Sequence, residues 1–200
     1  IFIMPAYHEI RAVYDRDSIT VYQAYNKNIA QLAIQHQKFV SPFSFQRMTW
    51  IKPSFLWLMG RSNWASKSGQ EYILAIRIKR DFWEKALTLS EHTDPILSRQ
   101  KNGMLWLQSF ENAQVHVQWD PERNLNSVFL VHRSIQIGIS RFLIQEFNDE
   151  AILSIEDITP LVRKMAKFRH DGQYKHAEKL LPKERIYPLN DALKKHLRMV

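Results

Sequence analysis

The sequence contains no cysteine and only five glycines among its 200 residues. Without cysteine, disulfide bonds and cysteine-ligated zinc sites are excluded. The few glycines form neither the Gly-x-x-x-x-Gly-Lys phosphate loop nor the Gly-x-Gly-x-x-Gly dinucleotide fingerprint, and no Gly-x-Ser-x-Gly elbow occurs. These absences exclude the commonest nucleotide-binding loops and serine-hydrolase sites, but they leave nucleotide binding by other means open.

Long apolar runs and clustered metal ligands are also lacking. No stretch approaches the roughly 18 to 20 apolar residues of a membrane span, and the apolar residues 1–5 are too few for a secretory signal. We therefore expect a cytoplasmic protein with no membrane partner. The eight histidines are scattered without His-x-x-x-His spacing, so we expect no metal.

Positive charge is concentrated near the C-terminus. Residues 161–200 hold 11 Lys and Arg against 4 Asp and Glu, whereas residues 1–160 hold 17 against 16. A nearly neutral body with a basic end favours a polyanionic partner such as RNA or DNA. The alternative is a solvated helical face that is rich in lysine.

The length suits a single domain. We expect a body over residues 1–160 and, packed on it, a basic helical extension over residues 161–200. Alternating or β-branched patterns predict strands, whereas helical spacing and caps predict helices. The expected strands are 10–15, 19–25, 48–51, 71–79, 114–119, one or two within 127–139, and 151–155. The expected helices are 26–37, 53–64, 81–89, 141–149, 161–170 and one after residue 190.

Two caps and two connections complete this prediction. Asn26 and Asn190 are predicted to cap the helices that follow them. Residues 90–103 are predicted to form a surface loop, and residues 120–123 a turn. Because strands and helices are mixed without regular alternation, the fold class is predicted as α+β, with a central, mainly antiparallel sheet flanked by helices.

Residues 47–64 combine three tryptophans with two arginines and one lysine. Pro53 suits the first position of a helix, because its missing N–H costs nothing there. We expect residues 47–54 to face a ligand and residues 55–64 to serve mainly in packing, including Trp57 and Trp64. Arg47 and Lys52 flank an apolar segment in which charge burial is costly, which favours a binding role.

Further candidates follow from the chemistry of anionic, aromatic ligands. Arginine binds phosphate through a planar fork, and aromatic rings can stack on a base or a nicotinamide. Asp120 and Glu122 follow a predicted strand, although a surface salt bridge is the equal alternative for Glu122. The remaining candidates are Tyr22, Tyr25, Thr49, Trp50 and Ser54 for a cofactor, and Arg61, Arg123, Arg133 and Gln136 for a substrate.

Several long segments carry a family resemblance. They are residues 9–15, 21–25, 47–57, 118–123, 133–138 and 181–188. These segments are similar to the family catalogued as domain of unknown function 4291. That resemblance spans nearly the whole chain and implies no activity.

The order of elements also resembles that of the ADP-ribosyltransferases. Residues 21–25 with the following helix look like the first element, residues 48–64 followed by 71–79 like the second, and residues 118–122 like the third. In that family the first two elements hold NAD. A glutamate on the third stabilises the oxocarbenium-like transition state or orients the acceptor.

The resemblance implies roles for individual residues. Arg47 and Lys52 would hold the pyrophosphate, Trp50 or Tyr25 would stack on the nicotinamide, and Glu122 would be catalytic, with Gln23 and Asp120 beside it. Gln23 stands where the family has His or Arg. A glutamine can hydrogen-bond a ribose but cannot make a charged contact.

Three functions remain open from the sequence. The first is an NAD-dependent ADP-ribosyltransferase, with nucleic acid as a candidate acceptor. The second is a nucleic-acid-binding module without catalysis, and the third is a nucleotide-processing enzyme of another fold. Convergence of Arg47, Trp50 and Glu122 on one cleft would favour the first; the oligomeric state is left open.

Overall fold

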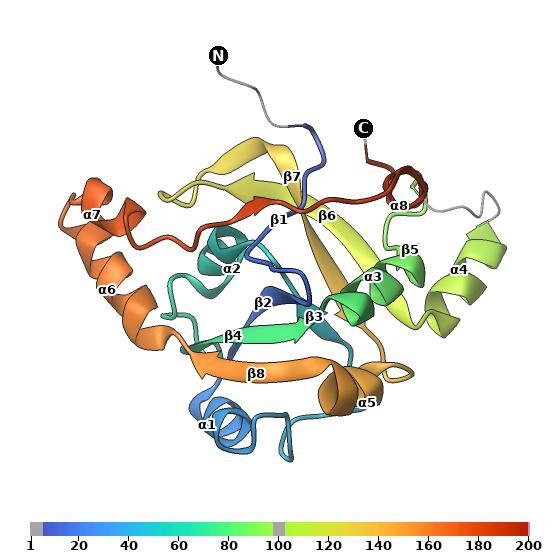
Figure 1. Ribbon diagram of the computed structural model, residues 1–200, viewed down its shortest axis with the longest axis horizontal. Helices are drawn as coiled ribbons and strands as arrows, with labels where there is room; N and C mark the ends of the chain where they lie inside the picture. The colour runs from blue at the N-terminus through green and yellow to red at the C-terminus, as the bar shows by residue number, and fades with distance from the viewer. Residues whose placement is uncertain (1–5, 98–102, 200) are drawn as a thin grey trace.

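The computed structural model describes residues 6–97 and 103–199, and most of its strands form two sheets (Figure 1). The first sheet has the antiparallel order β2-β4-β8, with β2 at Ser18–Tyr25, β4 at Tyr72–Lys79 and β8 at Ile152–Asp157. The second has the order β3-β7-β6-β5, with β3 at Thr49–Ile51, β7 at Phe129–Ile139, β6 at Val115–Arg123 and β5 at Ser90–His92. Only the β5–β6 pair is parallel among these, which confirms the predicted α+β class.

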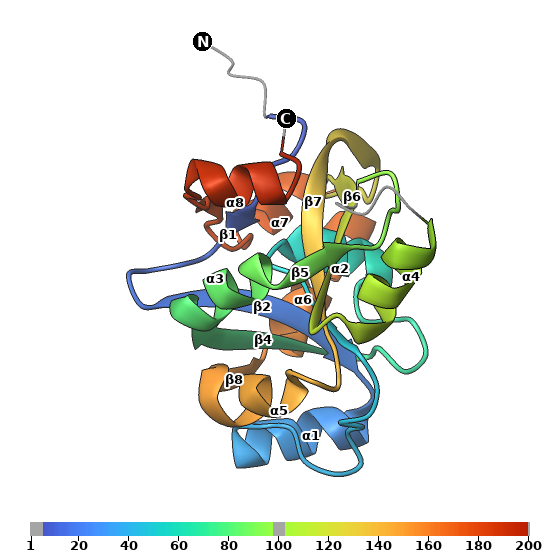
Figure 2. The same ribbon diagram turned by 90° about the vertical axis from the view of Figure 1, so that its right-hand side faces the viewer.

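The two sheets meet at one point between β2 and β3. An isolated bridge pairs Tyr22 with Lys52, and the backbone N–H of Tyr22 donates to the carbonyl of Lys52 at 2.7 Å. Beyond this bridge the ladder does not continue between β2 and β3 in the described residues. Figure 2 shows β6 and β7 rising steeply past β2 and β4. The central sheet is therefore split into two sheets that separate beyond this bridge.

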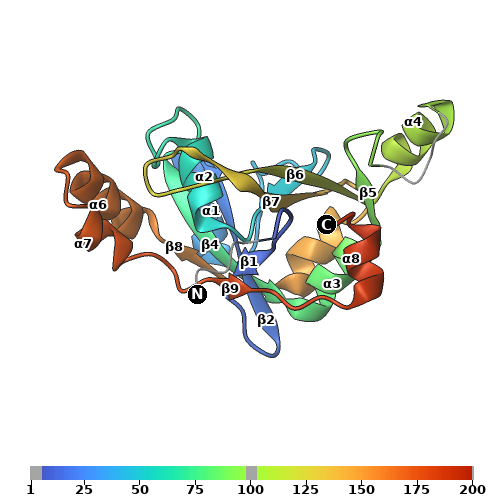
Figure 3. The same cartoon turned by 90° about the horizontal axis from the view of Figure 1, so that it is seen from above.

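Helices cover both sheets and extend from the two ends of the molecule. Figures 1 and 3 show α6 and α7 at one end and α4 at the other. Asn26 caps α1 by accepting from the N–H of Ile29, and Asn190 caps α8 by accepting from that of Leu193, as predicted. The helices are α1 Lys27–His36, α2 Phe55–Ser62, α3 Arg80–Thr88, α4 Gly103–Asn112, α5 Ile144–Glu146, the π-helical η1 Phe147–Ala151, α6 Thr159–His170, α7 Tyr174–Glu178 and α8 Asp191–His196.

Three local predictions are wrong. Helix α2 begins at Phe55 and not at Pro53, because the Ser54 hydroxyl caps it by accepting from the N–H of Trp57 at 3.1 Å. Residues 120–123 are no turn: β6 runs through Arg123, with a bulge after Pro121 that tolerates the missing proline N–H.

Residues 90–103 were predicted to form a loop, but Ser90–His92 form β5, which pairs in parallel with β6. The rest of that prediction falls partly on residues 98–102, which lie outside the described residues.

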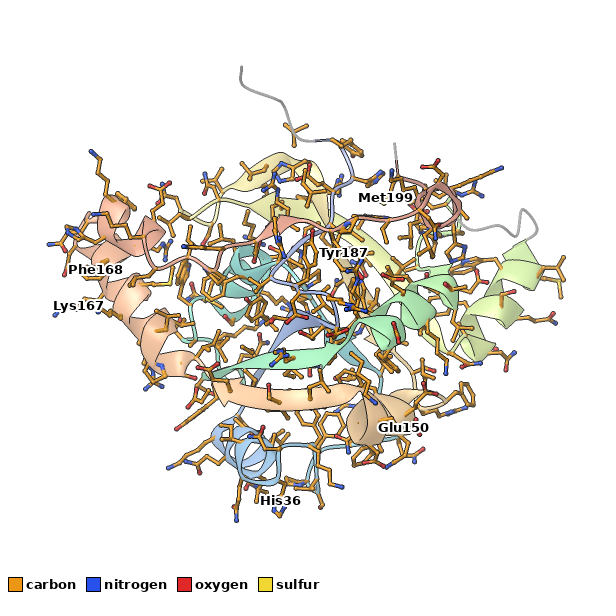
Figure 4. The ribbon with its side chains drawn as sticks, in the orientation of Figure 1. His36, Glu150, Lys167, Phe168, Tyr187 and Met199 are labelled. Atoms are coloured by element: carbon orange, nitrogen blue, oxygen red, sulfur yellow. The ribbon has the colours of Figure 1, made fainter. Side chains whose placement is uncertain are left out.

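The C-terminal residues complete the hydrophobic interior. Val162 and Met165 of α6 join a cluster with α2, whereas Tyr187, Leu193 and Leu197 join the larger cluster. Figure 4 shows Tyr187 in the middle of the molecule, with Lys167 and Phe168 out on α6. Residues 185–186 form the strand β9 (Arg185–Ile186), which pairs with β1 (Arg11–Ala12). In the described residues, no helix has both the length and the apolar character that crossing a bilayer requires.

Candidate functional site

A cavity of about 560 Å³ lies where the two sheets separate. Both sheets contribute polar groups to its wall, and helix α2 closes one side. A second hollow of about 280 Å³ adjoins it and shares Trp57, Arg61 and Asp120 with it. The cavity is lined by Gln23, Ala24, Tyr25, Met48, Thr49, Trp50, Lys52, Trp57, Leu58, Arg61, Gln70, Gln118, Asp120 and Gln136.

Asp120 is the carboxylate that the described residues present to this cavity. One of its oxygens accepts from the amide of Gln118 at 2.8 Å, and the other accepts from the amide of Gln136 at 2.7 Å. Gln118 and Gln136 face each other across the β6–β7 ladder, and Asp120 is two residues beyond Gln118 on the same strand face. Two strands thus hold one carboxylate in a fixed orientation, with lone pairs left for a ligand.

Gln23 lines the cavity and has one buried acceptor without a partner in the described residues. Its side chain is only 3% exposed, and its Nε2 donates to the hydroxyl of Thr49 at 2.6 Å and to the carbonyl of Trp50 at 3.0 Å. Because a carbonyl can only accept, this contact fixes which end of the amide is nitrogen. Its Oε1 then has no partner in the described structure. A buried acceptor without a partner is unfavourable, so the two hydrogen bonds that Nε2 donates hold this amide at a cost.

The hydroxyl of Tyr25 extends this network by hydrogen-bonding the Thr49 hydroxyl at 3.0 Å. Burial raises the pKa of Tyr25 to about 12, although its hydrogen bonds partly oppose the shift. The phenol therefore stays protonated at neutral pH. It serves as a neutral hydrogen-bonding group in the wall.

Lys52 is a buried amine without a salt-bridge partner in the described residues. Its Nζ lies 4.9 Å from the ring centroid of Trp57. The same atom donates a long hydrogen bond of 3.3 Å to the carbonyl of Trp50. In the described part of the chain it forms no salt bridge. Desolvation lowers the pKa of Lys52 to about 7, helped by Arg61 and opposed by Asp120. An anion in the cavity would stabilise its charged form.

Six predicted site residues do not line the cavity, so the expected convergence of Arg47, Trp50 and Glu122 is not found. Glu122 is buried and accepts from the backbone N–H of Arg123 at 2.8 Å. The other five lie elsewhere. Tyr22 packs edge-on against Phe55, Ser54 caps α2, Arg47 is exposed, Arg133 donates to the Tyr7 hydroxyl, and Arg123 lines only the adjoining smaller hollow.

Several residues of this region escaped the sequence reasoning. Trp57 was assigned to packing, yet it lines the cavity and lies beside Lys52. The place of Gln118 in the site could have been predicted, because it is two residues from Asp120 and so lies on the same face of β6. Glu184 had no local signal: its carboxylate accepts from the N–H of Phe55 at 2.7 Å at the start of α2, and burial raises its pKa to about 8.

These features define an α+β protein with a polar cavity between two mainly antiparallel sheets. The chain belongs to the family described as Domain of unknown function (DUF4291), whose model matches residues 9–187, as the sequence segments predicted. A comparison with curated proteins finds no match. Among residues 6–97 and 103–199, no group of three His, Asp or Glu side chains gathers in a way that could hold a metal ion.

Proposed function

We propose that this protein is an NAD-dependent ADP-ribosyltransferase-like enzyme and that the cavity between the sheets is its NAD site. One observation carries the proposal: the three segments whose order resembles that family, residues 21–25, 48–64 and 118–122, all contribute to the wall of the same cavity. Its volume of about 560 Å³ is in the range of ligand sites that enclose a molecule of this size.

The polar groups of the cavity suit the parts of NAD. The amide of Gln23, which Thr49 and Trp50 hold in the cavity wall, adds polar surface for the carboxamide of nicotinamide or a ribose hydroxyl. Lys52 and Arg61 supply positive charge for the pyrophosphate. The half-buried indole of Trp50 offers an aromatic face within the same wall.

Asp120 takes the role that the resemblance alone assigns to Glu122. The reaction breaks the bond between ribose C1′ and the nicotinamide nitrogen, whose electron pair leaves with nicotinamide. The acceptor's oxygen or nitrogen bonds to C1′ and loses one proton to water. A carboxylate held by the amides of Gln118 and Gln136 can stabilise the positive charge that develops on the ribose. Because it is already oriented, little reorganisation is needed at that moment.

Titration calorimetry with NAD, followed by mass spectrometry of released nicotinamide, tests this proposal. We expect Asp120→Asn to retain NAD binding but to slow nicotinamide release by about 10² to 10³-fold, the usual cost of one preorganised electrostatic group. Glu122→Gln is the matched control, since Glu122 lies two residues away and outside the cavity wall. It should retain the wild-type rate.

Two results would contradict the proposal. Absence of NAD binding at about 1 mM, the upper end of ordinary substrate affinities, would remove NAD from the cavity. Release of AMP in place of nicotinamide would show cleavage of the phosphoanhydride. It would assign the same cations to a nucleotide-processing enzyme of another kind.

A further inference from the structure

The smaller hollow is continuous with the proposed NAD site. Of its six lining residues, Trp57, Arg61 and Asp120 also line the large cavity, whereas Pro121, Arg123 and Phe129 belong to the hollow alone. Asp120 thus lies at the boundary between the two. A molecule in the hollow would therefore lie against the same carboxylate as the contents of the large cavity.

Arg123 is held in this hollow by three contacts. Its guanidinium carbon lies 4.2 Å from the ring centroid of Phe129, and its Nη1 donates to the carbonyl of Ser127 at 3.2 Å. The third contact is the close packing of the Arg123 side chain on Gly60 of α2. A Cβ at Gly60 would collide with Cδ and Nε of Arg123. The missing side chain lets Arg123 lie directly on α2. The guanidinium is therefore positioned before any ligand arrives.

Positive charge in the hollow is not neutralised by salt bridges. Neither Arg61 nor Arg123 forms a salt bridge in the described residues. Asp120 is the carboxylate that the described residues present to the hollow wall, and beside two guanidiniums it leaves an excess of positive charge. Two unpaired guanidiniums beside exposed aromatic surface match a ligand that carries both phosphate and planar rings. Phe129, at 61% exposure, supplies that surface.

The hairpin that carries Arg123 and Phe129 packs beside α6, which carries further cations. Figures 1 and 3 show the β6–β7 hairpin directed toward the end of the molecule that α6 and α7 occupy. Leu125 of this hairpin packs on the cluster that contains Val162 and Met165 of α6. The Arg169 guanidinium lies 4.2 Å from the ring centroid of Trp64, whose indole N–H donates to the Ser127 hydroxyl. The exposed cations of α6 are Arg163, Lys164 and Lys167.

We infer that the smaller hollow is the acceptor site and that its acceptor is single-stranded nucleic acid. Arg61 and Arg123 bind phosphates, and a base lies against Phe129. The transfer rests on the proposed function, whereas the binding does not. When nicotinamide leaves, an oxygen or nitrogen of the nucleic acid beside Asp120 bonds to ribose C1′, and its proton passes to water.

Fluorescence anisotropy with labelled single strands of about 12 nucleotides, DNA and RNA, tests binding on the full chain without NAD. We expect Arg123→Gln and Gly60→Ala each to weaken binding roughly tenfold, and Arg123→Gln to lower the slope of log affinity against log salt by about one. The control is Arg141→Gln. Arg141 is also exposed and also lies on a phenylalanine, 4.9 Å from the ring of Phe142, but it lies outside the hollow.

The outcomes separate the two proposals. Circular dichroism first shows that each variant is folded. The acceptor site would be overturned if wild type, Arg123→Gln and Gly60→Ala bound the single strands with equal affinity. It would also be overturned if Arg141→Gln lost as much affinity as Arg123→Gln. If NAD is consumed but only protein becomes labelled, the acceptor site is wrong and the NAD site stands. If the strands bind as expected but NAD does not, the proposed function fails and the nucleic-acid site stands.

Discussion

Trp50 pairs with Gly138 across the β3–β7 ladder, and a Cβ at position 138 would lie 3.0 Å from Cε2 of Trp50. The same Cβ would collide with the side chain of Met48. Both neighbours line the proposed NAD site. The absence of a side chain at Gly138 therefore allows them to lie flat against β7, and it determines how much room the cavity has.

Gly138→Ala should consequently reduce NAD affinity by about tenfold while costing about 1 to 3 kcal/mol in unfolding free energy, as is usual for overpacking. The cause is displacement of Trp50 into the cavity. Titration calorimetry measures the affinity, and denaturant unfolding measures the stability. Val131→Ala is the control, since Val131 lies on the same strand at 83% exposure. A Gly138→Ala variant with wild-type affinity would show that Trp50 does not limit the site.

Lys52→Met should stabilise the protein most at or below neutral pH. The folded pKa of Lys52 is about 7, below its ordinary value of 10.5, so the unfolded chain binds more protons between these values. The wild-type free energy of unfolding therefore rises with pH through this window and is lowest below it. Each pKa unit corresponds to about 1.4 kcal/mol. Methionine preserves the apolar stem without the charge.

Thermal unfolding of wild type and Lys52→Met between about pH 6 and pH 10 measures this effect, with the window taken from the Lys52 pKa. The difference in Tm should shrink as pH rises. Arg61 and Asp120 are the charged groups that act on Lys52, and the methionine variant retains both. The exposed Lys67→Met serves as control and should show no such trend. A pH-independent difference would mean that Lys52 is not buried as a neutral amine.

NAD binding should take up a proton through the same lysine. A bound pyrophosphate favours the ammonium form and raises the pKa of Lys52 from about 7, so affinity should be greatest below that pH and fall above it. Calorimetry at about pH 8 in two buffers of different ionisation enthalpy counts the protons. We expect up to one per NAD in the wild type and none in Lys52→Met. Equal uptake by both would place the titrating group elsewhere.

The fold was predictable where a signal is local. Asn26 and Asn190 act as caps because a short polar side chain reaches the N–H three residues on. Strand β4 matches its alternation because one strand face meets the core. The continuation of β6 through Pro121 was not predictable, because it depends on pairing with the distant strand β7. A bulge after Pro121 accommodates the missing proline N–H. The one-residue contact between the sheets, Tyr22 with Lys52, has no local signal either.

The site was predictable by residue type more than by position. The sequence indicates both Asp120 and Gln136 as site residues. Only the β6–β7 register shows that the Gln136 amide donates to the Asp120 carboxylate. Glu122 appeared equivalent to Asp120, whereas the bulge after Pro121 changes which side chains face the cavity. Contacts between distant segments decide such choices. Glu184, which meets α2 from 129 residues away, is the clearest case.

Glu184→Gln should leave stability unchanged in acid and increase it as pH rises. Burial raises the pKa of Glu184 from 4.5 to about 8; Glu122 adds to this, whereas the hydrogen bond from Phe55 and the charge of Arg11 oppose it. The stabilisation that belongs to the protonated carboxyl is complete below 4.5 and is lost as pH rises through about 8. Glutamine retains the neutral form and an oxygen for the Phe55 N–H.

The difference in Tm between Glu184→Gln and wild type should therefore be near zero below pH 4.5 and should widen toward pH 8. Glu178→Gln, an exposed neighbour in the same region, should show no widening. If Glu184→Gln lost stability at neutral pH, Glu184 would be ionised there and held by Arg11. The C-terminal segment would then be attached to α2 by charge, and not by the hydrogen bond of a neutral carboxyl.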